Sequence, residues 1–217
     1  MIDNEPVVRV YTPITTDLNT GYVDIVVKIY FKTEEFPNGG KMSLYLENLK
    51  IGDKIDFRGP VGKHRYSGNG RFIIKSTKTG PTTKIQGKRL NMISGGSGIT
   101  PMYQLIKYIC QDPKDSTQIR LLFANKTDDD ILLRKQLEAL ASSYPKQFQI
   151  WYTVGQSTIQ SWSYSLGRIN EEMIREHLFP SGDDVLVLMC GPAPMIDLAC
   201  KPALEKVGFQ SNRMIVF

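Results

Sequence analysis

The sequence predicts a two-part fold in which antiparallel β structure, a barrel or a sandwich, precedes an α/β domain with a parallel sheet. Before residue 75, short β-branched runs alternate with turns that contain Gly and Pro, which is typical of antiparallel sheets. After residue 89, continuous apolar runs alternate with helical stretches, which is typical of a parallel sheet covered on both faces. We therefore expect a β part at 1–74, a polar linker at 75–89 and an α/β part at 90–217.

In the first part, four short runs read as strands and one as a helix. The strands are expected at residues 7–13, 22–31, 53–62 and 71–74. The helix is expected at 41–49, because Met42, Tyr45, Leu46 and Leu49 share one face at helical spacing.

In the second part, five apolar runs read as strands, at residues 90–94, 119–125, 148–154, 184–190 and 214–217. Helices are expected between them at 101–111, 130–143, 170–178 and about 194–207. Right-handed crossovers place the carboxyl ends of all parallel strands at one edge of the sheet. Ligands of open α/β sheets bind at that edge, so we expect the functional site there.

Composition excludes several classes of protein. No apolar run reaches ~18 residues, so no membrane-spanning helix is expected. The start, Met1–Pro6, lacks the basic and apolar regions of a signal peptide. Cys110, Cys190 and Cys200 lie far apart without metal-ligand spacing, so we expect a reducing compartment and no metal site.

The net charge of +5 is unevenly distributed, because the residues between Phe57 and Gln111 include no Asp or Glu. The cations of this segment are Arg58, Lys63, Arg65, Arg71, Lys75, Lys78, Lys84, Lys88, Arg89 and Lys107. A solvated loop face and a surface that steers an acidic partner are both consistent with this composition. Nucleic acid is a poorer candidate, because the segment has neither interleaved aromatic residues nor a nucleic-acid-binding motif.

A glycine-rich loop, "MISGGSGITPM", joins the first strand of the second part to its first helix. Thr100 is expected as the helix N-cap and Pro101 as the first helical residue. A phosphate is attracted to the exposed N–H groups at such a helix start. The pattern is neither GxGxxG nor a Walker loop, and a tight strand-to-helix turn would also require glycine.

A second glycine, Gly191, follows another apolar strand in "MCGPAPM" and allows the backbone to approach a ligand closely. As a nucleophile, the adjacent Cys190 would need a neighbouring base. His64 and His177 are the only histidines, and neither is expected nearby. We therefore do not expect thiol chemistry or a histidine-dependent dehydrogenase.

Several segments, in their order along the chain, together resemble the NADH–cytochrome b5 reductase family of ferredoxin-reductase-type flavoenzymes. They are "RVYTPIT", "VVKIYF", "FPNGGKMSLYLENLKIGDKIDFRGPVG", "MISGGSGITPM", "LLFANKTDDDILLR", "INEEMIREHL", "LVLMCGPAPMI" and the terminal "VF". The resemblance implies an FAD-binding antiparallel β-barrel followed by a Rossmann-like NADH-binding sheet. It also implies the reaction: NADH reduces FAD, which passes electrons singly to a haem protein, commonly cytochrome b5.

The resemblance also implies the residues that bind FAD. Arg9 would pair with the pyrophosphate through its planar guanidinium, and Tyr11 and Thr12 would lie against the flavin ring. The full set is Arg9, Tyr11, Thr12, Val26, Lys28, Phe31, Gly40, Lys41, Met42, Ser43 and Thr100.

For NADH, the resemblance implies a turn that takes the pyrophosphate and a wall that positions the nicotinamide. The residues are Gly95, Gly96, Gly98, Cys190, Gly191, Pro192 and Met195. Thr100, Cys190 and Lys28 would act in catalysis by positioning, since the cofactors perform the bond chemistry. No acid–base pair is expected.

The sequence departs from the family pattern at two places. The family commonly has an Asp after the strand that ends at Val154, where this chain has Gly155, so we expect weaker discrimination against NADPH. The segment "RVYTP" begins eight residues after Met1, whereas family members run through several barrel strands first. The barrel is therefore expected to be shortened, with open strand edges.

The shortened barrel favours a second hypothesis for the function: the chain is a non-catalytic nucleotide-binding module that cannot retain FAD. The chain is expected to be a monomer without a membrane segment. It is expected in the cytoplasm or at the cytosolic face of a membrane.

Overall fold

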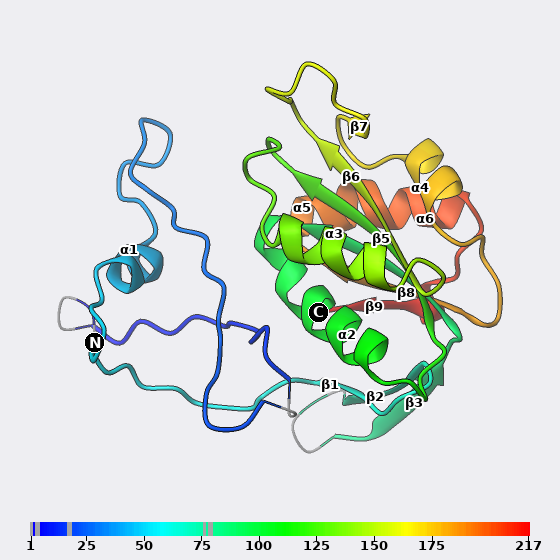
Figure 1. Cartoon of the computed structure of the whole chain (residues 1–217), viewed down its shortest axis with the longest axis horizontal. Coiled ribbons are helices and arrows are strands. Elements are labelled where there is room, and N and C mark those ends of the chain that lie inside the picture. Colours follow the sequence, from blue (N-terminus) through cyan, green and yellow to red (C-terminus); the bar gives the residue numbers. More distant parts are fainter. Residues whose placement is uncertain (1, 3–4, 17–18, 76, 78–79) are drawn as a thin grey trace. The chain divides into compact units, whose positions relative to one another are not determined.

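The structure, a computed structural model, describes residues 2, 5–16, 19–75, 77 and 80–217. Its internal contacts divide the chain into two units, Met1–Gly62 and Lys63–Phe217. Figure 1 colours the first unit blue to cyan and the second cyan to red.

In the first unit, the expected helix is present as α1 (Lys41–Glu47). The expected strands at 7–13, 22–31 and 53–62 are not formed, since these residues belong to no sheet. Backbone hydrogen bonds occur singly here, as from Ile14 N to Asp24 O (2.9 Å). A strand needs a continuous ladder with a neighbour, so a β-branched run alone did not suffice.

The second unit begins with an antiparallel sheet in the order β1-β2-β3. Its strands are β1 (His64–Tyr66), β2 (Arg71–Lys75) and β3 (Thr82–Gln86). β2 was expected, but β3 lies inside the segment expected as a linker. The polar residues of β3 are compatible with a strand because an antiparallel sheet buries only one face. On that face, Phe72 pairs with Ile85.

A six-stranded sheet fills the rest of the second unit, within residues 80–217, which are all described. Its order is β7-β6-β5-β4-β8-β9, and all neighbours are parallel. The strands are β4 (Arg89–Gly95), β5 (Gln118–Asn125), β6 (Phe148–Val154), β7 (Ser165–Leu166), β8 (Val185–Cys190) and β9 (Met214–Val216). The predicted fold class, antiparallel β structure followed by an α/β parallel sheet, is confirmed.

Helices cover both faces of the parallel sheet (Figure 1). One face carries α2 (Ile99–Gln111), which follows the short 3-10 turn η1 (Gly96–Gly98), and α3 (Arg134–Ser143). The other carries α4 (Glu171–His177), then α5 (Ala193–Met195), the π-helical η2 (Ile196–Cys200) and α6 (Lys201–Lys206). A final turn, η3 (Ser211–Arg213), leads into β9. Fully buried side chains such as Ile93, Leu122 and Val187 fill the space under α4 and α6.

A buried carboxylate fastens the antiparallel sheet to the parallel one. Asp115, in the loop before β5, accepts hydrogen bonds from Tyr66 Oη (2.6 Å), Asn69 N (2.9 Å) and Thr117 N (3.0 Å). Burial alone would raise the pKa of Asp115, but these hydrogen bonds outweigh it and hold the pKa below its ordinary value. This network explains why β1 to β3 belong to the second unit.

Candidate functional site

Two glycine-bearing loops meet at the carboxyl edge of the parallel sheet. β4 and β8 are neighbours, and Ser94 is the register partner of Cys190. A Cβ atom added to Gly98 would collide with the carbonyl group of Cys190, and one added to Gly95 would lie 2.6 Å from Met195 Sδ. The two loops therefore pack closely only because their glycines have no side chains.

The same contacts bring together the residues expected to bind NADH. A Cβ atom on Gly191 would lie 2.7 Å from Met195 Cε, and one on Gly95 would lie 3.1 Å from Pro192 Cδ. Gly96 differs, because open space surrounds it and its φ of +52° favours glycine. The sequence-predicted set thus forms one surface, on which Gly96 is the most open glycine.

Thr100 is not the N-cap that the sequence predicted. The turn η1 begins the helical path earlier, so that Gly98 caps α2 and Thr100 is its second residue. Its hydroxyl donates to Ser97 O (3.2 Å), and the side chain is buried. Pro101 is accordingly the third residue of α2 and not the first.

The start of α2 suits an anion better than the start of α4 does. No side chain caps α2, and no acidic residue lies in its first turn. In α4, by contrast, Asn170 accepts from Met173 N (2.9 Å), and Glu171 and Glu172 occupy the first turn. Ile99 N, the first amide of α2, already donates to Gly96 O of the turn η1. The N–H groups without helical partners are therefore those at the start of η1, and they are suited to a phosphate.

Cys190 has the properties of a small wall residue. Burial raises the pKa of its thiol, which keeps the sulfur protonated and weakly nucleophilic. Both histidines pack against aromatic rings: His177 stacks on Trp151 with ring centroids 3.8 Å apart, and His64 lies 4.7 Å from Phe217. Burial lowers the pKa of each histidine.

Buried polar atoms near the same edge have no hydrogen-bond partner among the residues that the structure describes. They include Ser94 Oγ at the end of β4 and both amide atoms of Asn125 at the end of β5. Buried polar groups are almost always paired, so these atoms suit a polar ligand or water. Sequence reasoning missed both residues, although Ser94 lies in "MISGGSGITPM" and Asn125 in "LLFANKTDDDILLR", because a sequence does not show which polar atoms are buried without a partner.

Sequence reasoning also missed the hydrogen bonds that join the loop after β5 to the loop after β6. Gly155 N donates to Asn125 O (3.2 Å), and Thr158 N donates to Asp128 Oδ1 (2.8 Å). This amide hydrogen bond is the main reason that the pKa of Asp128 is lowered. These hydrogen bonds hold the two loops together at the carboxyl edge of the sheet, next to the glycine loops.

In the first unit, two parts of the expected FAD set are joined by hydrogen bonds. Gly40 N donates to Tyr30 O (2.8 Å), and Tyr30 N donates to Ser43 Oγ (3.1 Å). The start of α1 is thereby tied to the segment that holds Val26, Lys28 and Phe31. Lys41 forms an ion pair with Glu5 (2.9 Å).

Other members of that set differ in exposure. Val26, Lys28, Met42 and Thr12 are partly buried, whereas Arg9 and Phe31 are exposed. Partial burial raises the pKa of Tyr11, which nearby Arg9 opposes and Tyr30 reinforces.

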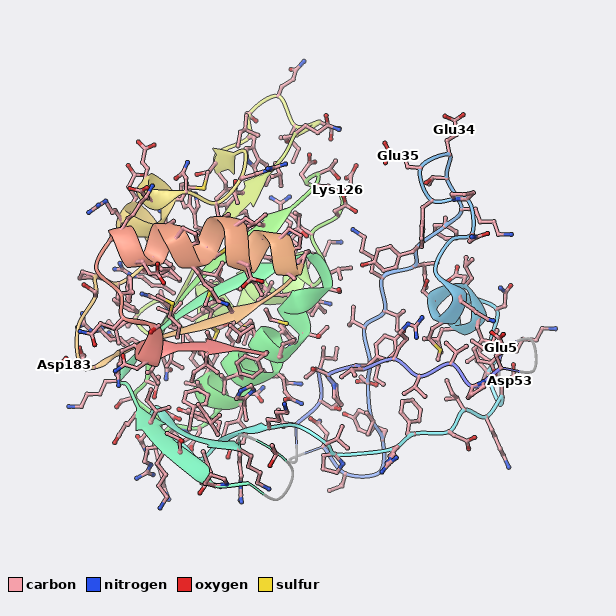
Figure 2. The ribbon with its side chains drawn as sticks, turned by 180° about the vertical axis from the view of Figure 1, so that it is seen from behind. Glu5, Glu34, Glu35, Asp53, Lys126 and Asp183 are labelled. Atoms are coloured by element: carbon pink, nitrogen blue, oxygen red, sulfur yellow. The ribbon has the colours of Figure 1, made fainter. Side chains whose placement is uncertain are left out.

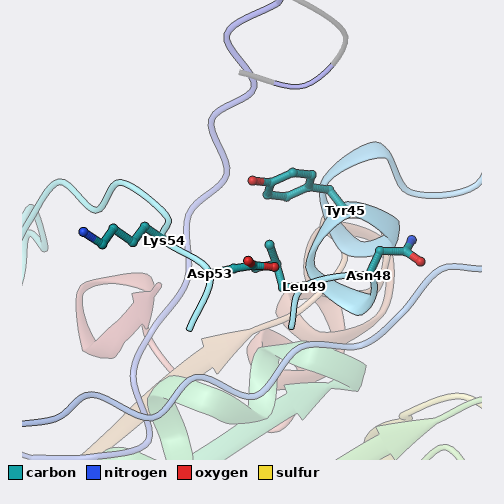
Figure 3. A pocket seen from close by; sticks show the side chains of 5 residues that line it. All are labelled: Tyr45, Asn48, Leu49, Asp53 and Lys54. Carbon is teal, nitrogen blue, oxygen red and sulfur yellow. The ribbon is translucent and has the colours of Figure 1, made fainter. Parts of the chain in front are cut away.

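The first unit also has an open cavity of about 390 Å³ at the end of α1 (Figure 3). Its lining residues are Tyr45, Asn48, Leu49, Asp53 and Lys54. None of them belongs to the residue sets expected to bind FAD or NADH.

The antiparallel sheet carries much of the basic segment on one face. Arg65, Ile73 and Lys84 are register partners across β1, β2 and β3, so their side chains share a face. Arg71 and Lys75 lie two positions before and after Ile73 on β2, so their side chains extend the same face. We call the four exposed cations Arg65, Arg71, Lys75 and Lys84 the cationic face. Lys78 of the basic segment lies outside the described residues.

Within the described part of the chain, no helix has the length and apolarity needed to cross a bilayer.

Comparison with known proteins follows the same division of the chain. Residues 1–66 match the model of the oxidoreductase FAD-binding domain, and residues 92–201 match that of the oxidoreductase NAD-binding domain. The human NADH-cytochrome b5 reductase 1 is 50% identical over 218 residues, which cover 100% of this chain and 71% of the relative. NADH-cytochrome b5 reductase 2 of Gallus gallus is 50% identical over 97% of this chain and 70% of its own length.

A solved structure agrees with these relatives. The cytochrome b5 reductase domain of Ulva prolifera nitrate reductase superposes with a TM-score of 0.92 at 44% identity, covering 99% of this chain and 80% of that one. From this likeness over its whole length, the chain belongs to the NADH–cytochrome b5 reductase family.

Proposed function

We propose that this protein is an FAD-dependent reductase that takes electrons from NADH and delivers them to a haem protein. The interlocked glycine loops at the ends of β4 and β8 carry the proposal, because they form a dinucleotide-binding edge in a chain whose FAD- and NAD-binding regions follow in the family order. When bound, FAD supplies the redox chemistry that side chains lack, since a flavin accepts a hydride and releases single electrons.

Each loop residue has a defined task in this proposal. The open backbone at Gly96 and the start of α2 hold the pyrophosphate, while Cys190 and Met195 form the wall for the nicotinamide. Thr100 and Lys28 position the flavin. In the first unit, Arg9 and the start of α1 hold the FAD phosphates, and Tyr11 and Thr12 lie against its ring. Correct placement matters, because an error of ~1 Å can cost about 100-fold in rate.

An absorption spectrum tests the proposal directly. The purified chain should absorb between about 350 and 500 nm as flavoproteins do, and NADH should bleach that band. A colourless protein that NADH still stabilises against heat would instead support a nucleotide-binding module without flavin. Identity of 50% over the whole chain, together with matches to both the FAD- and the NAD-binding domain models, favours the reductase.

Cytochrome b5 is the acceptor that we infer for the cationic face. The four exposed cations of the cationic face lie in a segment without acidic residues, so they attract an acidic partner over a long range. Reduction of cytochrome b5 should slow as salt rises, because at 0.1 M salt the attraction between exposed charges is screened beyond roughly 10 Å. The double variant R65Q/K84Q should slow that step while bleaching by NADH stays unchanged. A rate of cytochrome reduction indifferent to salt would contradict this docking face.

We further propose that the chain is a monomer and acts in the cytoplasm or at the cytosolic face of a membrane. Size-exclusion chromatography with light scattering tests the first statement, and cell fractionation tests the second.

A further inference from the structure

We propose that the thioether sulfur of Met195 is a site of oxidative modification by hydrogen peroxide, and that its conversion to the sulfoxide weakens dinucleotide binding at the glycine loops. This inference rests on the proposed function, because the affected surface is the one assigned to NADH.

The side chain of Met195 lies against both glycine loops. Its Sδ atom lies 2.6 Å, and its Cε atom 3.0 Å, from the position of a Cβ atom added to Gly95. Its Cε atom lies 2.7 Å from the corresponding position on Gly191. These distances are shorter than van der Waals contacts, so the packing leaves no space for one further heavy atom on the Gly95 side of the sulfur.

Met195 is also one of the few methionines of the second unit that solvent can reach. Its side chain is partly buried. The buried methionines of this unit are Met92, Met102, Met173 and Met189. Met214 on β9 is partly buried as well, but its register partner is Val187 in the middle of β8, away from the glycine loops. Met195 is therefore the methionine that combines access for a peroxide with contact to both loops.

The course of the chain after β8 places this side chain at the carboxyl edge of the sheet. Met195 ends α5, directly before the π-helical η2. Figure 2 shows this helical run (orange) on the near face of the sheet, beginning at the edge where Lys126 follows β5. A bulkier side chain at Met195 therefore displaces the glycine loops and no distant surface.

The cysteines nearby are poorer targets for peroxide. A thiol reacts with peroxide mainly as its thiolate, and burial raises the pKa of Cys190. Burial raises the pKa of Cys200 to about 12, and its side chain is fully buried. A thioether has no proton to lose, so the oxidation of Met195 depends on access alone.

The modification is a transfer of one oxygen atom with two electrons. A lone pair of Met195 Sδ attacks one oxygen of hydrogen peroxide, so that an S–O bond forms while the O–O bond breaks. The other oxygen leaves as hydroxide and takes up the remaining proton, which gives water. The sulfur is oxidised by two electrons and the peroxide is reduced by two.

The sulfoxide is larger than the thioether and polar. Since the side of the sulfur that faces Gly95 is closed, the new oxygen either points into the dinucleotide surface or forces the two loops apart. Both outcomes lower the affinity for the dinucleotide.

Calorimetric titration with NAD⁺, before and after peroxide treatment, tests the proposal without reducing the flavin, and peptide mass spectrometry locates the added oxygen. We expect oxidation of Met195 and an affinity for NAD⁺ that is lower by about tenfold. Treatment with methionine sulfoxide reductases should restore the affinity. NAD⁺ added before the peroxide should slow the oxidation of Met195 more than that of Met214.

Two variants locate the effect. M195L has an apolar side chain without sulfur, so its affinity for NAD⁺, whatever its initial value, should not change with peroxide. M214L, the matched control, should lose affinity on peroxide treatment as the wild-type protein does.

Three results would overturn the inference: Met195 unmodified at a peroxide concentration that oxidises free methionine, unchanged NAD⁺ affinity once Met195 is oxidised, or an equal loss in M195L. Bleaching of the flavin by NADH is measured in parallel on untreated protein. If NADH bleaches the flavin while peroxide has no effect on affinity, only the modification site is refuted. If NADH does not bleach a flavin-loaded sample, the proposed reductase function fails first.

Discussion

The two units of this chain show how differently similar β-branched sequences can be used. From Phe72 onward, buried apolar side chains form a core, while the described residues of the first unit bury none. Among the described residues, ten of the fifteen exposed large hydrophobic side chains belong to the first unit, including Val8, Val10 and Phe57. A run such as "VLVLM" in β8 becomes a strand because β4 and β9 flank it. The difference therefore lies in the neighbours that each run has, and much less in the run itself.

Removing a large side chain should reveal this contrast most strongly. Leu188 is fully buried in β8, so L188A should lower the free energy of unfolding by about 2–5 kcal/mol. Val10 is 87% exposed, so V10A should change it by less than about 0.5 kcal/mol. Denaturant melts of both variants check this. Comparable losses would mean that the first unit has a core after all.

Glycine substitution should give the next largest effect. In G98A the new Cβ atom would collide with the backbone of Cys190, so we expect a loss of about 2–3 kcal/mol together with weaker NADH binding. Gly62 has no atom within 4 Å of an added Cβ atom, and its φ is not positive. G62A should therefore be close to neutral. Thermal unfolding with and without NADH measures both effects, and a stable, NADH-binding G98A protein would contradict the packing of the two loops.

The smallest effect concerns the link between the two sheets of the second unit. D115N should lose about 1.5 kcal/mol, because the charged acceptor for Tyr66 and Asn69 is gone. Since the folded-state pKa of Asp115 is lowered, its contribution is present above the unfolded pKa and disappears as pH falls below about 4. Wild-type stability should thus converge on that of D115N in acid. A constant difference between the two from pH 3 to pH 7, a range chosen to span about one unit below that pKa, would contradict this assignment.

Much of the second unit follows from sequence pattern alone. All five apolar runs became strands, and the boundaries of β6 agree with the expected 148–154. Long apolar runs are informative because burial on both faces leaves little choice of partner. β7 escaped notice because its two residues, Ser165 and Leu166, show no periodicity.

The site was less predictable than the sheet. The glycines and Cys190 stood out because each follows a strand, where parallel topology brings loops together. Thr100 was misplaced by two residues, because no motif signals that a 3-10 turn precedes the helix. That Ser94 and Asn125 lie at one edge of the sheet depends on strand order, which a local pattern does not contain.

The order of the parallel sheet also affects how the chain is made. β4 lies between β5 and β8, yet β8 follows β4 by about ninety positions of sequence. During synthesis, the middle of the sheet therefore keeps one unpaired edge until nearly the entire chain has left the ribosome. Nascent chains that stall before residue 185 expose this unpaired strand edge. We therefore expect them to aggregate and to bind chaperones.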